Sequence, residues 1–148
     1  MILELITGPI HSGKTTRLAA WCAAQPAGTV GGVLQPARAT GRHFVDVATN
    51  QDFPLDAPPD APEALVQRVG RYCFAAAAFA WAAERLAQAA ADPAVRVLVV
   101  DEIGPLELRG AGLDPVVRTV LASGRAGLRV VLVVRDGLAA AVRERYGE

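Results

Sequence analysis

The stretch GPIHSGKT, residues 8–15, decides the fold that this sequence predicts. It matches the pattern G-x-x-x-x-G-K-[ST] at every fixed position. The two glycines allow the backbone to turn tightly and to approach a ligand closely. Successive N–H groups then point into one concavity at the N-terminus of a helix, where a phosphate group is favoured. The motif therefore predicts a phosphate-binding loop between a strand and a helix.

Lys14 is the most distinctive residue of this motif. Fourteen of the 15 basic residues of the chain are arginine, and Lys14 is its single lysine. A sequence with arginine at every other basic position indicates that this one position needs a compact ammonium group. We expect Lys14 to reach the β- and γ-phosphate oxygens of a nucleotide and the Thr15 hydroxyl to reach Mg²⁺.

Strands and helices alternate on both sides of the motif. Apolar or β-branched runs predict strands at residues 2–7, 30–35, 44–48, 65–69, 95–100 and 128–134. Helical spacing predicts helices at residues 14–25, 74–91, 114–123 and 138–146, with Asp114 as an N-cap. The continuous apolar strands are typical of a sheet that is buried on both faces. The alternation predicts a three-layer α/β fold with a mostly parallel central sheet.

A second candidate motif is the acidic pair that follows the strand at residues 95–100. We expect Asp101 to lie at the carboxyl end of the sheet, beside the phosphate loop, and to hold Mg²⁺ through water. Glu102 is the candidate general base that polarises an attacking water, with Glu107 as the substitute. A cation is also needed for the charge that develops on the γ-phosphate. Arg135, which ends the strand at residues 128–134, is the first candidate for that role.

Three further arginines stay open for that role: Arg71, Arg42 and Arg109. The candidate catalytic residues are thus Lys14, Glu102 and Arg135, and the candidate Mg²⁺ ligands are Thr15 and Asp101. The candidate nucleotide-binding residues are Gly8, Pro9, Ile10, His11, Ser12, Gly13, Lys14, Thr15, Thr16, Asp101 and Glu102.

Composition limits the other classes of function. With 148 residues, of which 52% are hydrophobic and 20% charged, the chain is expected to form one domain, residues 1–148. Fifteen basic and 15 acidic residues give no net charge, so no nucleic-acid partner is predicted. The longest apolar run has 12 residues, fewer than the roughly 20 of a membrane span. Two cysteines and an N-terminus without a signal peptide indicate a cytoplasmic protein.

The motifs at residues 8–16 and Asp101–Leu108 resemble those of a known family. It is the family of small P-loop nucleoside-triphosphatases that includes a thermophile enzyme and a cancer-related human homologue. Residues 65–86 are similar to it less specifically. The resemblance extends from residue 2 to about residue 135. It implies Mg²⁺-dependent hydrolysis of ATP, GTP and other nucleoside triphosphates to the diphosphate and phosphate, with broad base tolerance. His11-Ser12 replaces the small residues that relatives often carry there.

Two other functions fit the same fold. A small-molecule or nucleoside kinase would need an acceptor pocket and a lid, and residues 36–62 are the candidate lid. A nucleotide-binding adaptor would instead switch a partner surface when its nucleotide changes. The preferred base, the protein partner, the oligomeric state and the strand order are left open by the sequence.

Overall fold

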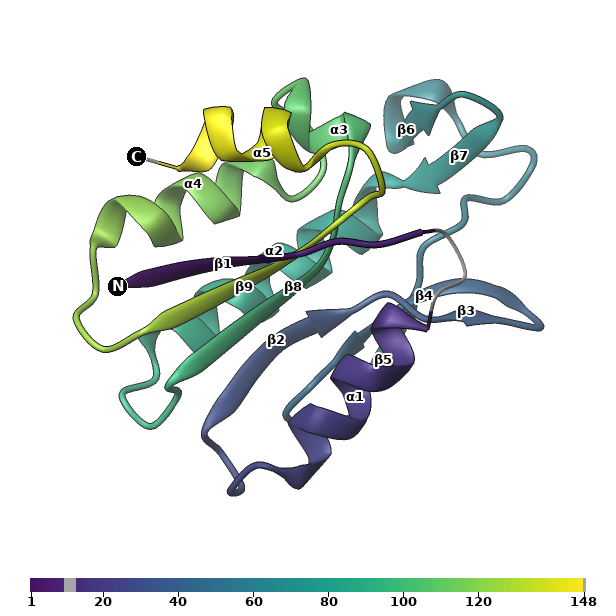
Figure 1. The fold of residues 1–148 in the computed structure, drawn as a ribbon. Helices are drawn as coiled ribbons and strands as arrows, with labels where there is room; N and C mark the ends of the chain where they lie inside the picture. The colour runs from purple at the N-terminus through teal and green to yellow at the C-terminus, as the bar shows by residue number, and fades with distance from the viewer. Residues whose placement is uncertain (10–12, 148) are drawn as a thin grey trace.

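The computed structural model describes residues 1–9 and 13–147 and contains a mixed α/β arrangement (Figure 1). Its strands are β1 (Ile2–Ile6), β2 (Val30–Leu34), β3 (Ala37–Arg38), β4 (Gly41–Asp46), β5 (Asp52–Pro54), β6 (Val66–Val69), β7 (Tyr72–Ala75), β8 (Val97–Ile103) and β9 (Arg129–Val134). Its helices are α1 (Lys14–Ala24), α2 (Ala76–Ala91), α3 (Pro105–Leu108), α4 (Asp114–Ser123) and α5 (Ala139–Tyr146), with a short 3-10 turn at Glu63–Leu65.

The central sheet has the strand order β1-β9-β8-β2-β4-β3, and β5 pairs with β4. The first four strands of this order are parallel, and β4 runs antiparallel to β2. Parallel strands end at one edge of a sheet, so β1, β2, β8 and β9 deliver the residues that follow them to the same place. The antiparallel β4 begins at that edge. The hairpin β6–β7 forms a separate two-stranded sheet, on the side of Figure 1 where β1 ends.

Helices cover both faces of the sheet, which gives three layers. Along β8 and β9 alternate side chains enter different clusters: Val99 and Val131 pack with Leu18 of α1. Leu98 and Leu132 belong to the larger cluster, which includes buried residues of α2, α4 and α5. Both faces of these strands are therefore apolar, as their continuous hydrophobic sequence requires. The predicted fold class, with its mostly parallel central sheet, is confirmed.

The strand β2 fits between its neighbours because its centre is glycine. Gly32 has a φ of 115°, and a Cβ at this position would overlap the backbone of Val99 in β8. Side chains other than glycine rarely adopt this conformation. The close approach of β2 to β8 brings Gln35, the residue directly after β2, to Asp101 of β8.

Several predicted boundaries are wrong. The strand expected at residues 95–100 is β8, which runs from Val97 to Ile103 and therefore contains Asp101 and Glu102 instead of ending before them. The strand expected at residues 44–48 is β4, which ends at Asp46 because that carboxylate accepts a hydrogen bond from the Thr49 hydroxyl at 2.8 Å and forms a turn. The helix expected from residue 74 begins at Ala76, because Tyr72–Ala75 pairs with β6. Asp114 is the first residue of α4 rather than its N-cap, and its carboxylate faces α5 instead.

Candidate nucleotide-binding site

Lys14 lies at the start of α1 and joins two strands of the sheet. It follows Gly13, whose φ of 82° is in the left-handed region that favours glycine. The Lys14 ammonium donates a hydrogen bond to the carbonyl of Gly8 at 3.0 Å and to that of Val134 at 3.4 Å. The charge is thus held at the edge of the sheet, between the residues that follow β1 and the end of β9.

Thr15 and Asp101 are in direct contact, although they are 86 residues apart. The Thr15 hydroxyl donates to Oδ2 of Asp101 at 2.9 Å, and the Gln35 backbone N–H donates to the same oxygen at 3.1 Å. Asp101 is 1% exposed. Burial raises the pKa of Asp101 to about 6, against the lowering effect of these two hydrogen bonds. Both donors are neutral, so a cation bound here would stabilise the ionised carboxylate.

Glu102 lies at an irregularity in β8, directly after Asp101. Asp101 pairs with Val133 and Ile103 with Val134, so Glu102 is an extra residue in the ladder. A β-bulge of this kind re-aims a side chain. Glu102 lines a pocket at the carboxyl edge of the sheet together with Arg135, while Asp101 stays buried beside Thr15.

Arg135 directly follows β9, and its backbone N–H donates to the carbonyl of Ile103 at 3.0 Å. Of the other candidate arginines, Arg42 lines the same pocket as Arg135 and Glu102. Arg109 instead donates to the carbonyl of Arg68 at 2.8 Å, and Arg71 donates to the Tyr72 hydroxyl at 3.3 Å. The structure thus places two of the four candidate arginines, Arg42 and Arg135, in the pocket that Glu102 lines.

The electrostatics of Tyr72 reflect the same arrangement. Its pKa is lowered, first by the hydrogen bond and charge of Arg71 and then by the charges of Arg42 and Arg135. Tyr72 also lines the pocket that contains Glu102. Several positive groups therefore act on one small region, which is a favourable environment for an anion.

The remaining candidate residues lie around the start of α1. Gly8 is partly buried and Pro9 exposed at the end of the segment after β1, and Thr16 is exposed on α1. Ile10, His11 and Ser12 lie outside the described residues, so their predicted roles stay predictions.

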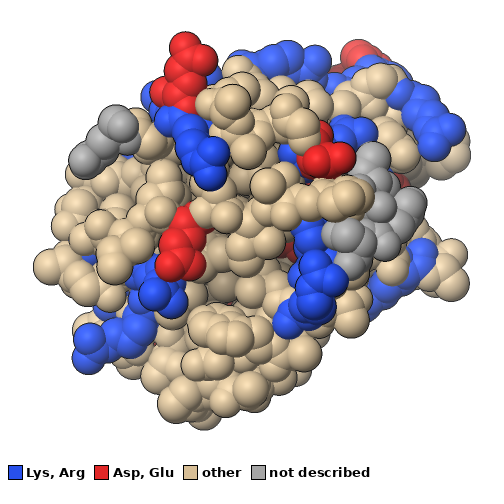
Figure 2. All heavy atoms as spheres, viewed as in Figure 1, with Lys and Arg blue, Asp and Glu red and all other residues tan. Residues whose placement is uncertain are grey.

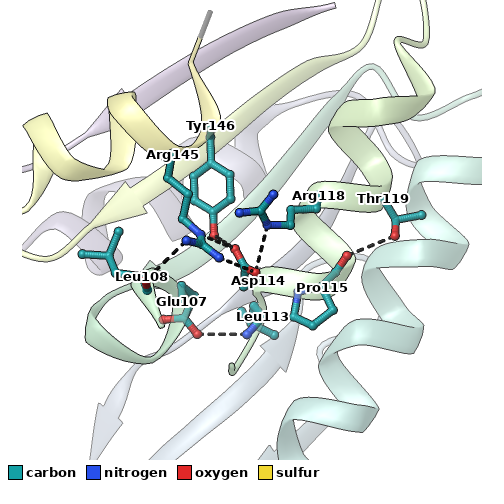
Figure 3. Close-up of polar contacts among 9 residues, drawn as sticks. All are labelled: Glu107, Leu108, Leu113, Asp114, Pro115, Arg118, Thr119, Arg145 and Tyr146. Atoms are coloured by element: carbon teal, nitrogen blue, oxygen red, sulfur yellow. Dashed lines mark hydrogen bonds and ion pairs between the residues drawn. The ribbon is translucent and has the colours of Figure 1, made fainter. Parts of the chain in front are cut away.

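Glu107 is a residue whose position the sequence did not predict. It is 3% exposed, and its two carboxylate oxygens accept the N–H groups of Gly104 and Leu113, each at 2.9 Å. Figure 3 shows the bond to Leu113. Burial raises the pKa of Glu107 to about 7. Both oxygens are used in fixing the turn after Glu102, so Glu107 is a positioning residue. Its spacing of three from Gly104 is the only sequence signal for this role.

A larger pocket lies on the other side of Lys14, between α1 and the unpaired edge of β1. Its volume is about 320 Å³, and its lining includes Ile6, Leu18 and Trp21. None of its lining residues is Thr15, Asp101 or Glu102. On this face, drawn in Figure 2, basic and acidic side chains are scattered over a mostly uncharged surface. We attribute this pocket to the open edge of β1 rather than to the acidic pair.

A family model described as NTPase matches residues 4–147, nearly the whole chain. The chain belongs to this NTPase family. Membership confirms the resemblance to nucleoside triphosphatases and supports nucleotide binding and hydrolysis as the class of function. A search of curated proteins finds no match. No helix among the described residues is both long and apolar enough to cross a membrane.

Two solved structures are similar over nearly all of the chain. A human cancer-related nucleoside triphosphatase has a TM-score of 0.68 and 26% identity, with 98% of this chain and 85% of that chain covered. THEP1 from the hyperthermophile Aquifex aeolicus has a TM-score of 0.68 and 18% identity, with 98% of this chain and 83% of that chain covered. The second likeness shows the fold alone, and both agree with the three-layer architecture.

Proposed function

We propose that this NTPase-family protein hydrolyses ATP, GTP and other nucleoside triphosphates to the diphosphate and phosphate in a Mg²⁺-dependent reaction, within one domain of residues 1–148. The observation that carries the proposal is the meeting of Lys14, Thr15 and the acidic pair at one edge of the sheet. Phosphoryl transfer needs positioning and charge stabilisation more than covalent chemistry, and this set of residues supplies both.

Phosphate binding would use the N-terminus of α1. The positive end of the helix dipole and the free N–H groups there favour anions. The Lys14 ammonium accepts no hydrogen bonds and has three donors. Two of these are directed at the carbonyls of Gly8 and Val134, so the ammonium is held in place at the point where a phosphate would lie.

Thr15 and Asp101 fit the way in which proteins bind Mg²⁺. This ion prefers one or two carboxylates and takes its other ligands from water and substrate phosphates. Among the described residues no group of three His, Cys, Asp or Glu could form a metal cage. One hydroxyl beside one buried carboxylate is compatible with a metal that arrives with its nucleotide. When bound, Mg²⁺ would neutralise charge on the phosphates.

The pocket beside Glu102 has room for an attacking water. The pocket lined by Glu102 and Arg135 has a volume of about 30 Å³. A cavity of roughly 10–15 Å³ holds one water molecule, so this one has room for about two. Glu102 would therefore act as general base on a water, and Arg135 would stabilise the charge on the terminal phosphate.

Product analysis with each triphosphate, with and without candidate acceptors, tests this function. We expect release of diphosphate and inorganic phosphate that requires Mg²⁺ and does not depend on any acceptor. Transfer of the phosphoryl group to an added acceptor would instead show a kinase. Turnover that becomes appreciable only with a partner protein would show an adaptor.

Two substitutions test the assigned residues. Lys14→Ala is expected to abolish nucleotide binding, because it removes the ammonium that the carbonyls of Gly8 and Val134 hold at the start of α1. Glu102→Gln is expected to keep nucleotide affinity and lower the rate of hydrolysis by about 10²–10⁴-fold. Glu144→Gln, on the exposed side of α5, makes the same chemical change away from the site and serves as the control. An unchanged rate in Glu102→Gln would refute its role as base.

A further inference from the structure

Arg42, one of the candidate arginines from the sequence, is brought to the site by the pairing of β4 with β2. It is the second residue of β4, and β4 is antiparallel to β2. The start of β4 therefore lies at the edge where β2 ends and where Gln35 donates its N–H to Asp101. Arg42, Gln35 and Glu102 line one pocket.

The backbone of Arg42 is fixed on both sides. Its N–H donates to Oδ2 of Asp56 at 2.9 Å, and its carbonyl accepts the Leu55 N–H at 2.9 Å. The guanidinium lies over the Tyr72 ring, with Cζ 4.5 Å from the ring centroid, and 5.9 Å from that of Phe74. These two rings are nearly parallel, with an interplanar angle of 5°. Arg42 is thus held on an aromatic platform by cation–π contact.

The N–H groups of this guanidinium are available to a ligand. Neighbouring arginines are used in ion pairs: Arg38 contacts Asp52 at 2.6 Å, and Arg68 contacts Glu63 at 2.7 Å. Within residues 1–9 and 13–147, no carboxylate is paired with the Arg42 guanidinium. Stacking uses the face of the guanidinium and leaves its edge, where the five N–H groups lie, for an anion.

We propose that Arg42, stacked on Tyr72 at the pocket of Glu102 and Arg135, contacts the terminal phosphate of a bound nucleoside triphosphate and sets the preference for triphosphate over diphosphate. This inference rests on the proposed function. A guanidinium edge matches two phosphate oxygens at once, and that phosphate is the group that a diphosphate lacks. Arg42 and Arg135 would then approach the same phosphate from β4 and from the end of β9.

The test is the ratio of two affinities. Equilibrium binding of a non-hydrolysable ATP analogue and of ADP, both with Mg²⁺, is measured for the wild type and for Arg42→Ala. We expect the affinity for the analogue to fall about 10- to 100-fold, as for the loss of charge-assisted hydrogen bonds, and the affinity for ADP to change less than about twofold. Arg42→Lys keeps the positive charge but loses the planar guanidinium with its paired N–H groups. Its affinity for the analogue should lie between those of the wild type and Arg42→Ala.

Arg38→Ala is the matched control, because Arg38 lies in the same hairpin but is already paired with Asp52. It should leave both affinities unchanged. Should Arg42→Ala fail to fold, Tyr72→Leu removes the platform and should also lower the preference for triphosphate. An equal loss of affinity for the ATP analogue and for ADP, or no loss of either affinity, would overturn the inference. The loss of nucleotide binding in Lys14→Ala would in that case still support the site. A wild-type protein that binds neither nucleotide would overturn the proposed function and this inference together.

Discussion

Asp101 and Asp114 are both buried aspartates, 1% and 3% exposed, in opposite electrostatic surroundings. Asp101 accepts hydrogen bonds from the Thr15 hydroxyl and the Gln35 N–H, and burial raises its pKa to about 6. Burial acts to raise the pKa of Asp114 as well, but the hydrogen bonds from Arg145 and Tyr146 outweigh it and lower the pKa to about 2.

Figure 3 shows how completely Asp114 is surrounded. Arg145 donates to both carboxylate oxygens, at 2.7 and 3.0 Å, and the Tyr146 hydroxyl donates at 2.5 Å. Arg118 adds a contact at 3.1 Å. These donors tie α5 to the start of α4. A carboxylate with its charge balanced in this way stabilises the fold, whereas Asp101 accepts hydrogen bonds from neutral donors alone, which is compatible with its proposed role at Mg²⁺.

The largest expected effect on stability is that of Asp114→Asn. The substitution leaves Arg145, whose side chain is 22% exposed, without its carboxylate. Removing one partner of a buried ion pair costs about 3–5 kcal/mol, and the partial exposure of Arg145 favours the lower end of that range. Denaturant unfolding measures the change. Arg118 contacts the same carboxylate with a side chain that is 53% exposed, so Arg118→Ala should cost less than about 1 kcal/mol of stability. Equal losses of stability in the two variants would contradict the conclusion that the Arg145–Asp114 pair stabilises the fold more than the exposed Arg118 contact does.

Acid should weaken the same cluster. An ordinary Asp has a pKa of about 3.9, so a folded pKa of about 2 means that Asp114 contributes about 2–3 kcal/mol of stability above pH 4–5. This contribution is lost as the pH falls toward 2, because the Asp114 carboxylate then becomes protonated in the folded state and loses its charge. Unfolding free energies of the wild type and Asp114→Asn, compared between pH 7 and pH 3, isolate the effect. The difference in stability between the two proteins should narrow by about 1 kcal/mol between pH 7 and pH 3, and a constant difference would contradict the low pKa.

The same contrast separates what the sequence predicted from what it could not. The strand β1, the helix α1 and the cores of β8 and β9 were predicted, because continuous apolar runs and a motif with fixed glycines are local signals. The meeting of Thr15 with Asp101 followed from the rule that parallel strands end at one edge. Their roles toward a nucleotide stay predictions.

Non-local pairing explains what was missed. The bulge that turns Glu102 out of the ladder depends on register with β9, which no local pattern records. Asp114 looked like an N-cap because its preceding loop and Pro115 are local signals, but Arg145 and Tyr146 compete for its carboxylate from 31 and 32 residues away. Arg42 was one of several candidate arginines until the β2–β4 pairing placed it at the site.

The smallest expected effect on stability, and the sharpest test of the comparison, is that of Asp101→Asn. The amide oxygen of Asn can still accept the hydrogen bonds from Thr15 and Gln35, and the buried charge is removed. The free energy of unfolding near pH 7 should therefore fall by less than about 1 kcal/mol, or rise. Binding of a Mg²⁺–nucleotide should weaken by about 10-fold or more, because a charged ligand oxygen has been replaced by a neutral one. Calorimetric titration and unfolding of one preparation measure both quantities. A loss of stability as large as that in Asp114→Asn would mean that Asp101 is bound into the fold in the same way, and that its surroundings are not prepared for a cation.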